Sequence, residues 1–135
     1  DFVASHSADS WQVSNPPILS TAPLRASLAL FDEAGDKALE EKGQKLSEFL
    51  LQGLDELSPL PLRLTSPRDW SRRGYQISLH VEKGLDSLQD QLEQADVFID
   101  VRQPSTLRVT ANPMYNSFED VWRFLDGLKR WAKAL

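Results

Sequence analysis

Residues 75–81 decide the type of fold, and they read Tyr75-Gln76-Ile77-Ser78-Leu79-His80-Val81. Apolar and polar side chains alternate along this stretch, so Tyr75, Ile77, Leu79 and Val81 fall on one face of a β-strand. A half-buried strand needs partner strands beside it and a layer of structure over its apolar face.

The segments on either side of this strand predict those partners. Further strands are expected at residues 62–65, 97–101 and 106–110, each bordered by turn residues. Helices are expected at residues 21–34, 36–57 and 84–95, and from Asn116 or Ser117 to near the end of the chain. The order α, α, β, β, α, β, β, α predicts an α+β fold, in which an antiparallel or mixed sheet of three to four strands is covered by helices on one face.

Two of these helices carry specific start signals and apolar stripes. Thr21 is the expected N-cap of the first helix, and Ser117 with Asp120 forms a loose capping box at the start of the last one. The spacing predicts that the first helix buries Leu24, Leu28 and Phe31. It predicts that the last helix buries Phe118, Trp122, Leu125 and Leu128.

Composition narrows the function classes. The chain has 135 residues, 41% of them apolar, which suits one globular domain. Its net charge of −5 argues against a non-specific nucleic-acid binder, but leaves room for one or two arginines that hold a small anion. With no cysteine and only two histidines, disulfides, thiol nucleophiles, Cys-type zinc sites and multi-His metal sites are excluded.

No signal peptide or membrane-spanning run is visible, so a cytoplasmic protein is expected. The chain does not begin with Met, so a longer parent protein remains an alternative.

Two places are candidate binding sites. In the segment Ser14-Asn15-Pro16-Pro17, the prolines either make a rigid loop before a helix or hold the Asn15 amide toward a polar ligand. Arg108 lies between two apolar strand residues. It is either an arginine on the solvent face of the sheet or a guanidinium that grips a carboxylate through two hydrogen bonds.

The remaining polar and aromatic residues have more ordinary interpretations. Arg72 and Arg73 are expected on the solvated surface or in ion pairs, with a phosphate clamp as the alternative, and Arg68-Asp69 is expected to form a local salt bridge. His80, on a strand edge beside Glu82, is expected to be structural. Trp11 and Trp70 lie in predicted loops and are the aromatic residues that favour a ligand or interface contact.

Three groups of segments, taken in order, are similar to the C-terminal part of kynureninase. The first group is Trp11-Gln12-Val13-Ser14-Asn15-Pro16-Pro17-Ile18-Leu19, residues 22–28 and residues 31–35. The second is Pro67-Arg68-Asp69, Arg72-Arg73-Gly74 and residues 76–79. The third is Asp100-Val101-Arg102, Pro104, Leu107-Arg108-Val109 and residues 115–124. Each motif is weak alone, whereas the ordered set covers nearly the whole chain.

The resemblance implies a pyridoxal-phosphate (PLP) enzyme of the aspartate-aminotransferase fold. Its family reaction is hydrolysis of L-kynurenine to anthranilate and L-alanine in tryptophan catabolism. The family enzyme is a homodimer with sites at the subunit interface, and a large domain carries the cofactor lysine. Residues 1–135 are then a single C-terminal small domain, in which residues 1–20 are an N-terminal arm and active-site loop and residues 21–135 are the α, α, β, β, α, β, β, α domain.

The same resemblance assigns site residues. Arg108 resembles the arginine that holds the substrate α-carboxylate. Ser14 and Asn15 resemble the pair beside the substrate ring and the cofactor, with Asn15 the better candidate for contact with PLP. No lysine here resembles the Schiff-base lysine, so no catalytic residue is assigned and the chain alone is expected to be inactive. The alternatives are a non-catalytic binding module of the same fold, and a PLP enzyme acting on another β-substituted amino acid.

Overall fold

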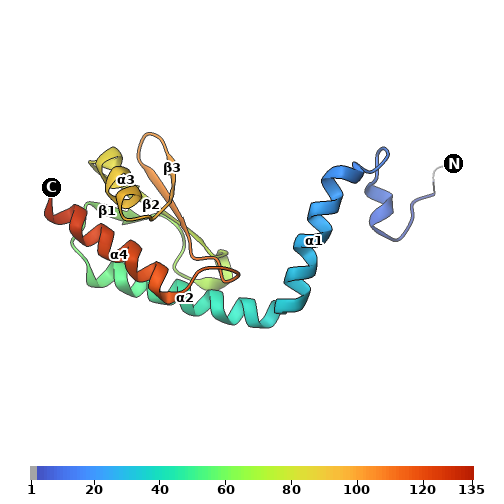
Figure 1. Ribbon diagram of the computed structural model, residues 1–135, viewed down its shortest axis with the longest axis horizontal. Coiled ribbons are helices and arrows are strands. Elements are labelled where there is room, and N and C mark those ends of the chain that lie inside the picture. The colour runs from blue at the N-terminus through green and yellow to red at the C-terminus, as the bar shows by residue number, and fades with distance from the viewer. Residues whose placement is uncertain (1–2) are drawn as a thin grey trace. The chain divides into compact units, whose positions relative to one another are not determined.

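The computed structural model describes residues 3–135, which form two compact units that divide between Asp36 and Lys37 (Figure 1). The first unit contains the 3₁₀-helix η1 (Ala8–Trp11) and helix α1 (Ile18–Ala34). The second unit contains nearly all of α2 (Asp36–Glu56), followed by β1 (Leu62–Leu64), η2 (Trp70–Arg72), β2 (Gln76–Val81), α3 (Leu85–Gln94), β3 (Asp100–Arg102), β4 (Thr106–Thr110) and α4 (Phe118–Lys133).

The second unit is built on a four-stranded sheet. The strand order is β1-β2-β4-β3, and every neighbouring pair is antiparallel. The α+β prediction is therefore confirmed, and of the arrangements left open the antiparallel one with four strands is found. Strand β4 occupies the predicted residues, and β2 starts one residue later than predicted.

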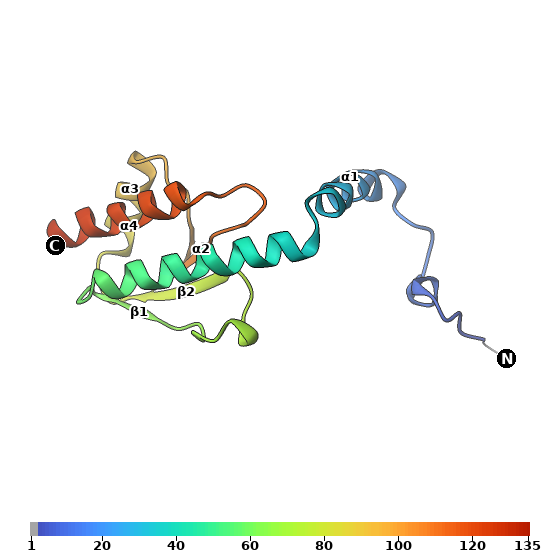
Figure 2. The ribbon, with the colours of Figure 1, turned by 90° about the horizontal axis from the view of Figure 1, so that it is seen from below.

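The core lies between one face of this sheet and the helices α2, α3 and α4. Ile77, Leu79 and Val81 of β2 are buried, whereas Ser78 and His80, on the opposite face, remain partly exposed. The buried strand residues belong to one apolar cluster with the helices. The helical members of this cluster include Leu46, Leu50, Leu88, Leu92 and Leu128. Figures 1 and 2 show α2 and α4 running side by side, and they meet closely where Gly53 faces Leu125.

Helix α1 differs from its prediction in two respects. It begins at Ile18 with Pro17 as N-cap, so the predicted cap at Thr21 is wrong. Because the helix starts one turn earlier, the Thr21 hydroxyl lies inside it and donates to the Pro17 carbonyl. The predicted burial of Leu24, Leu28 and Phe31 is also wrong, since all three are exposed and no residue of α1 is buried. In the described part of the first unit, the sole other helical element is the short η1, and it does not bury this face of α1.

The strand predicted at residues 97–101 is shorter and lies later, at Asp100–Arg102. Asp96 adopts a left-handed conformation with φ of 57°, and the Val97 amide donates to the Leu92 carbonyl. These two features keep residues 97–99 at the end of α3 instead of beside β4. Phe98 is consequently 80% exposed.

The predicted capping box of α4 is confirmed, but the predicted stripe is only half right. Ser117 and Asp120 exchange hydrogen bonds as expected. Leu125 and Leu128 are buried, whereas Phe118 and Trp122 are 47% and 55% exposed. The buried face instead continues through Val121, Phe124 and Trp131. Two overlapping stripes of apolar residues run along α4. Packing against α2 and α3 buries the stripe that differs from the predicted one.

Candidate functional site

Arg108 lies on the sheet face opposite the core. Its strand neighbour Leu107 is fully buried, and the alternation of β4 turns the next side chain to the open face. Arg108 stands between Ser78 of β2 and Asp100 of β3 in the strand register. Its side chain is 33% exposed. Arg108 therefore lies on the solvent face of the sheet, which is one of the two positions considered from the sequence. A neighbouring acidic residue also orders its guanidinium.

That partner is Asp100, on the neighbouring strand. Arg108 Nε donates to Asp100 Oδ2 at 2.5 Å, and Nη2 donates to the same oxygen. Arg102 Nε donates to this oxygen at 3.3 Å. The hydrogen bond from Arg108 holds the pKa of the Asp100 carboxyl below its ordinary value, with further help from the nearby charges of Arg102 and Arg108. Asp100 is therefore ionised at neutral pH, and the pair is a charge-assisted contact.

The two bonds leave part of the guanidinium unused. A guanidinium has one donor edge formed by Nε and Nη2 and a second edge formed by its two terminal nitrogens. Asp100 takes the first edge, so Nη1 has no share in the pair. The second edge has the spacing that binds a carboxylate through two parallel hydrogen bonds. The arrangement is thus capable of holding one further carboxylate.

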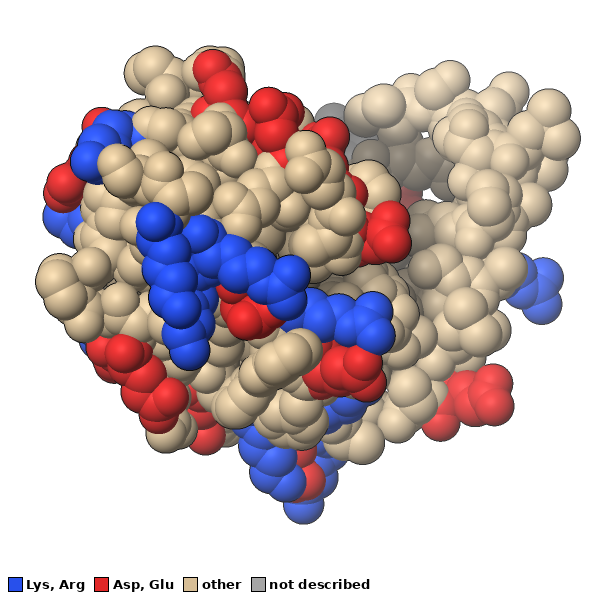
Figure 3. Space-filling model, turned by 60° about the vertical axis from the view of Figure 1, so that its left-hand side comes forward, with Lys and Arg blue, Asp and Glu red and all other residues tan. Residues whose placement is uncertain are grey.

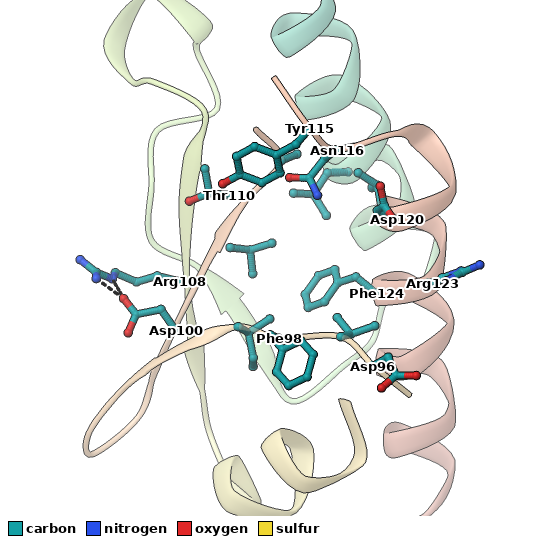
Figure 4. A pocket seen from close by; sticks show the side chains of 16 residues that line it. Asp96, Phe98, Asp100, Arg108, Thr110, Tyr115, Asn116, Asp120, Arg123 and Phe124 are labelled. Atoms are coloured by element: carbon teal, nitrogen blue, oxygen red, sulfur yellow. Dashed lines mark hydrogen bonds and ion pairs between the residues drawn. The ribbon is translucent and has the colours of Figure 1, made fainter. Parts of the chain in front are cut away.

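A cavity of about 550 Å³ lies behind this pair, between β4 and α4. Figure 4 shows Phe98 and Phe124 facing its interior, with Tyr115 and Asn116 at one end. Arg108 and Asp100 contribute to its rim, but their charged ends point away from Phe124. The Asn116 side chain already accepts from the Asn112 amide. The cavity is lined by both apolar and polar side chains, and of the polar ones Asn116 and Asp120 accept hydrogen bonds from backbone amides.

Ser14 and Asn15 belong to the first unit, whereas Arg108 belongs to the second. Both residues lie exposed in the segment between η1 and α1. The Ser14 carbonyl accepts a hydrogen bond from the Gln12 side chain at 2.8 Å. The position of Asn15 just before the proline pair agrees with a short loop that leads into α1.

The loop before β2 forms a small aromatic cluster. The ring of Trp70 lies 5.5 Å from that of Tyr75, and the Arg73 guanidinium lies 5.3 Å from the Trp70 ring centre. The expected local pair of Arg68 with Asp69 is wrong. Arg68 instead binds both carboxylate oxygens of Asp55 on α2. Asp69 is not available because it accepts from the amide and hydroxyl of Ser71.

The other residues singled out in the sequence have simpler surroundings. His80 Nδ1 lies 3.0 Å from the Ser105 hydroxyl, a contact that links β2 to the turn before β4. Trp11 and Arg72 are exposed. Trp122 lines a groove between α3 and α4.

The described residues do not by themselves fit a PLP site. Covalent attachment of PLP needs a lysine in a pocket beside the reacting atoms. The chain has six lysines, and none lines either cavity. Lys42 donates to the Pro113 carbonyl at 2.7 Å, and Lys37 pairs with Glu41 on the surface. The six lysines therefore provide no attachment point for PLP at either cavity.

The surface carries side chains of opposite charge that pair with each other. Figure 3 shows basic side chains lying among acidic ones on one face. On α4, Arg123 pairs with Glu119 and Arg130 with Asp126, so part of the positive charge is neutralised locally. No helix in the described part of the chain is long and apolar enough to cross a membrane. Residues 3–135 contain no group of three metal-ligating side chains.

The sequence did not single out Asp100 as a site residue. The signal was present in the hairpin of β3 and β4, which turns at residues 103–105. A symmetric hairpin about this turn places residue 100 opposite residue 108, and the structure has that register. The sequence prediction did not extend to the register of these strands, so it did not pair Asp100 with Arg108.

Comparison with known sequences gives a consistent result. Residues 39–128 match the sequence model of the kynureninase C-terminal domain. A kynureninase of Xanthomonas euvesicatoria pv. vesicatoria is 43% identical over 136 residues, which cover 98% of this chain and 32% of the relative. A kynureninase of Myxococcus xanthus is 43% identical over 132 residues, covering 98% of this chain and 31% of the relative. This chain thus spans about a third of the length of these curated relatives.

Solved structures show the same fold at low sequence identity. The apo cysteine desulfurase of Thermococcus onnurineus NA1 superposes with a TM-score of 0.79 at 20% identity, over 97% of this chain and 35% of that one. A C-DES mutant with glycine covalently linked to the PLP cofactor superposes with a TM-score of 0.68 at 18% identity, over 93% of this chain and 35% of that one. Together with the family match, these comparisons confirm the resemblance found in the sequence. The chain belongs to the kynureninase family, and residues 39–128 match its C-terminal domain.

Proposed function

We propose that this chain is the C-terminal part of a PLP-dependent enzyme that hydrolyses L-kynurenine to anthranilate and L-alanine, and that Arg108 binds the substrate α-carboxylate. The observation that supports this most strongly is the guanidinium of Arg108. It lies on the open face of the sheet, one edge is held by Asp100, and the other edge takes no part in that pair. The names of the curated relatives support the choice of reaction.

The rest of the proposed site is distributed along the protein. Ser14 and Asn15, in the segment of residues 1–20, contact the substrate ring and, through Asn15, the cofactor. The lysine and the other PLP-binding residues belong to the part of the protein outside residues 1–135. The proposed enzyme is a homodimer, as the sequence resemblance implies, and its proposed location is the cytoplasm, as expected from a sequence without a visible signal peptide.

Within this scheme Arg108 acts by binding and orientation. A bidentate guanidinium–carboxylate contact fixes both the position and the rotation of the group it binds. A substrate held in this way presents the bond to be cleaved in one orientation, which lowers the entropic part of the barrier.

Replacing Arg108 with Ala in the full-length protein tests the proposal. Loss of the charged contact is expected to cost about 2–5 kcal/mol of transition-state binding. At about 1.4 kcal/mol per factor of ten, kcat/KM for L-kynurenine falls by roughly 30-fold to several thousand-fold. Arg68→Ala is the matched control, because Arg68 also binds an aspartate, Asp55, through two hydrogen bonds. An unchanged kcat/KM in Arg108→Ala would remove Arg108 from substrate binding.

A further inference from the structure

We propose that Asp100 is a positioning residue, which holds Arg108 in the orientation that binds the substrate carboxylate. The inference rests on the proposed function of Arg108. Asp100 does not need to touch the substrate for this role, because it acts through the arginine.

The backbone fixes the two residues relative to each other. Asp100 and Arg108 are directly paired in the antiparallel register of β3 and β4. Side chains opposite each other on one face of a sheet have their Cβ atoms only about 5 Å apart. The carboxylate therefore reaches Nε, the nitrogen nearest the strand, at 2.5 Å. Because Nε and Nη2 both donate to the carboxylate, one whole edge of the planar guanidinium is restrained, which a single bond would do less well.

This restraint matters because a free arginine side chain is flexible. Ordering a long side chain costs up to about 2 kcal/mol of rotamer entropy. When the protein has already ordered it, that cost no longer falls on substrate binding. Asp100 can restrain Arg108 in this way because the two residues lie on paired strands of one sheet, which fixes the carboxylate beside the guanidinium.

Charge gives a second argument. An aspartate beside an arginine reduces the attraction of that arginine for an anion. Arg102 also contacts Asp100, at 3.3 Å, so the cluster contains two guanidinium groups and one carboxylate. One positive charge remains, which matches a single substrate carboxylate. The cluster thus combines orientation with enough charge to bind an anion.

The test uses Asp100→Asn and Asp100→Ala in the full-length protein, with two ligands that differ only in the carboxylate. L-kynurenine carries the carboxylate, and kynuramine is the same molecule without it. We expect the KM for L-kynurenine to rise about tenfold in the Asn variant and further in the Ala variant, as for the loss of a hydrogen bond to a charged group. Inhibition by kynuramine should stay unchanged in both variants.

The controls separate the possible failures. Asp55→Asn removes the charge from the other arginine-bound aspartate and should leave KM unchanged.

A similar loss of affinity for both ligands would show a general structural effect and overturn the inference. Tighter binding of L-kynurenine would show that Asp100 only weakens Arg108, which also overturns it. If Arg108→Ala impairs binding and the Asp100 variants do not, the inference fails while the proposed function stands. If Arg108→Ala has no effect, the proposed function of Arg108 fails first.

Discussion

At the scale of single residues, Asp120 shows how hydrogen bonds from a nearby residue lower the pKa of a carboxyl. Asp120 Oδ2 accepts from the Ser117 amide at 2.7 Å and from the Ser117 hydroxyl at 2.9 Å. These bonds, the one from the amide first, hold the pKa of the Asp120 carboxyl below its ordinary value of 3.8. Because both bonds favour the charged form, they stabilise the start of α4 only while the carboxyl is ionised.

The acid stability of the protein should therefore depend on Asp120. A carboxyl whose pKa is lower in the folded state contributes stability above its unfolded pKa, and that contribution is lost as the pH falls through the folded pKa. We expect Asp120→Asn to lower the free energy of unfolding at neutral pH by about 0.5 kcal/mol, as for other carboxylates at helix N-termini. The difference from wild type should be smaller at about pH 2 than at neutral pH, because protonation of the folded-state carboxyl progressively removes this contribution.

Urea unfolding at the two pH values measures this difference. Asp90→Asn is the control, because Asp90 is an exposed carboxylate in the middle of α3. An Asp120→Asn variant as stable as wild type at neutral pH would contradict the assignment.

Residue contacts were predictable where they are local in sequence. The capping box follows from a serine and an acidic residue three positions later, and this pattern is sufficient. The partner of Arg68 was not predictable in the same way. Asp69 is adjacent, but it is held by Ser71, and Asp55 reaches Arg68 only after α2 has packed beside the sheet.

At the scale of elements, α4 shows the limit of apolar periodicity. Trp122 and Trp131 both follow apolar spacing in the sequence. In the structure Trp131 is 1% exposed and its indole nitrogen donates to the Ser87 hydroxyl on α3 at 3.1 Å, whereas Trp122 is mostly exposed. Periodicity alone does not decide between two overlapping stripes, because the choice depends on the neighbouring helices.

Two tryptophan substitutions test which face of α4 is buried. Trp131→Ala should lower the free energy of unfolding by about 3–5 kcal/mol, the range for removing a buried large aromatic side chain. Trp122→Ala should change it by about 0.5 kcal/mol or less, as expected for a surface substitution. Each variant serves as the control for the other in thermal or urea unfolding. Equal losses of stability in the two variants would contradict the observed orientation of the helix.

The same distinction applies to the strands. Strand β4 was predicted with its observed bounds, because turn residues flank it on both sides. Strand β3 was misplaced because Val97, Phe98 and Ile99 have strand-like composition. The left-handed Asp96 diverts them, and this conformation is uncommon for a residue other than glycine.

At the scale of the whole molecule, the proposed site draws on segments distant in sequence and on protein outside this chain. Arg108 was singled out because it lies between two apolar residues of a strand and because a family resemblance assigned it a function. The roles of Ser14 and Asn15 rest on the resemblance alone. The curated relatives are about three times as long as this chain. Groups that surround a substrate from outside these 135 residues are not predictable from this sequence.

The 135-residue chain is therefore expected to give no hydrolysis of L-kynurenine by itself. Its six lysines lie outside both cavities, and Lys42 and Lys37 already have partners on the protein surface. PLP supplies the electron sink for this kind of chemistry, so a protein that lacks a lysine to hold it loses the reaction. Titration with PLP should give no saturable absorbance band of lysine-bound cofactor, and chromatography should detect no anthranilate. The full-length protein is the positive control, and far-UV circular dichroism shows whether the shorter chain is folded. A saturable band together with anthranilate formation by the folded short chain would mean that one of these six lysines holds the cofactor, and the proposed division of the site would then be wrong.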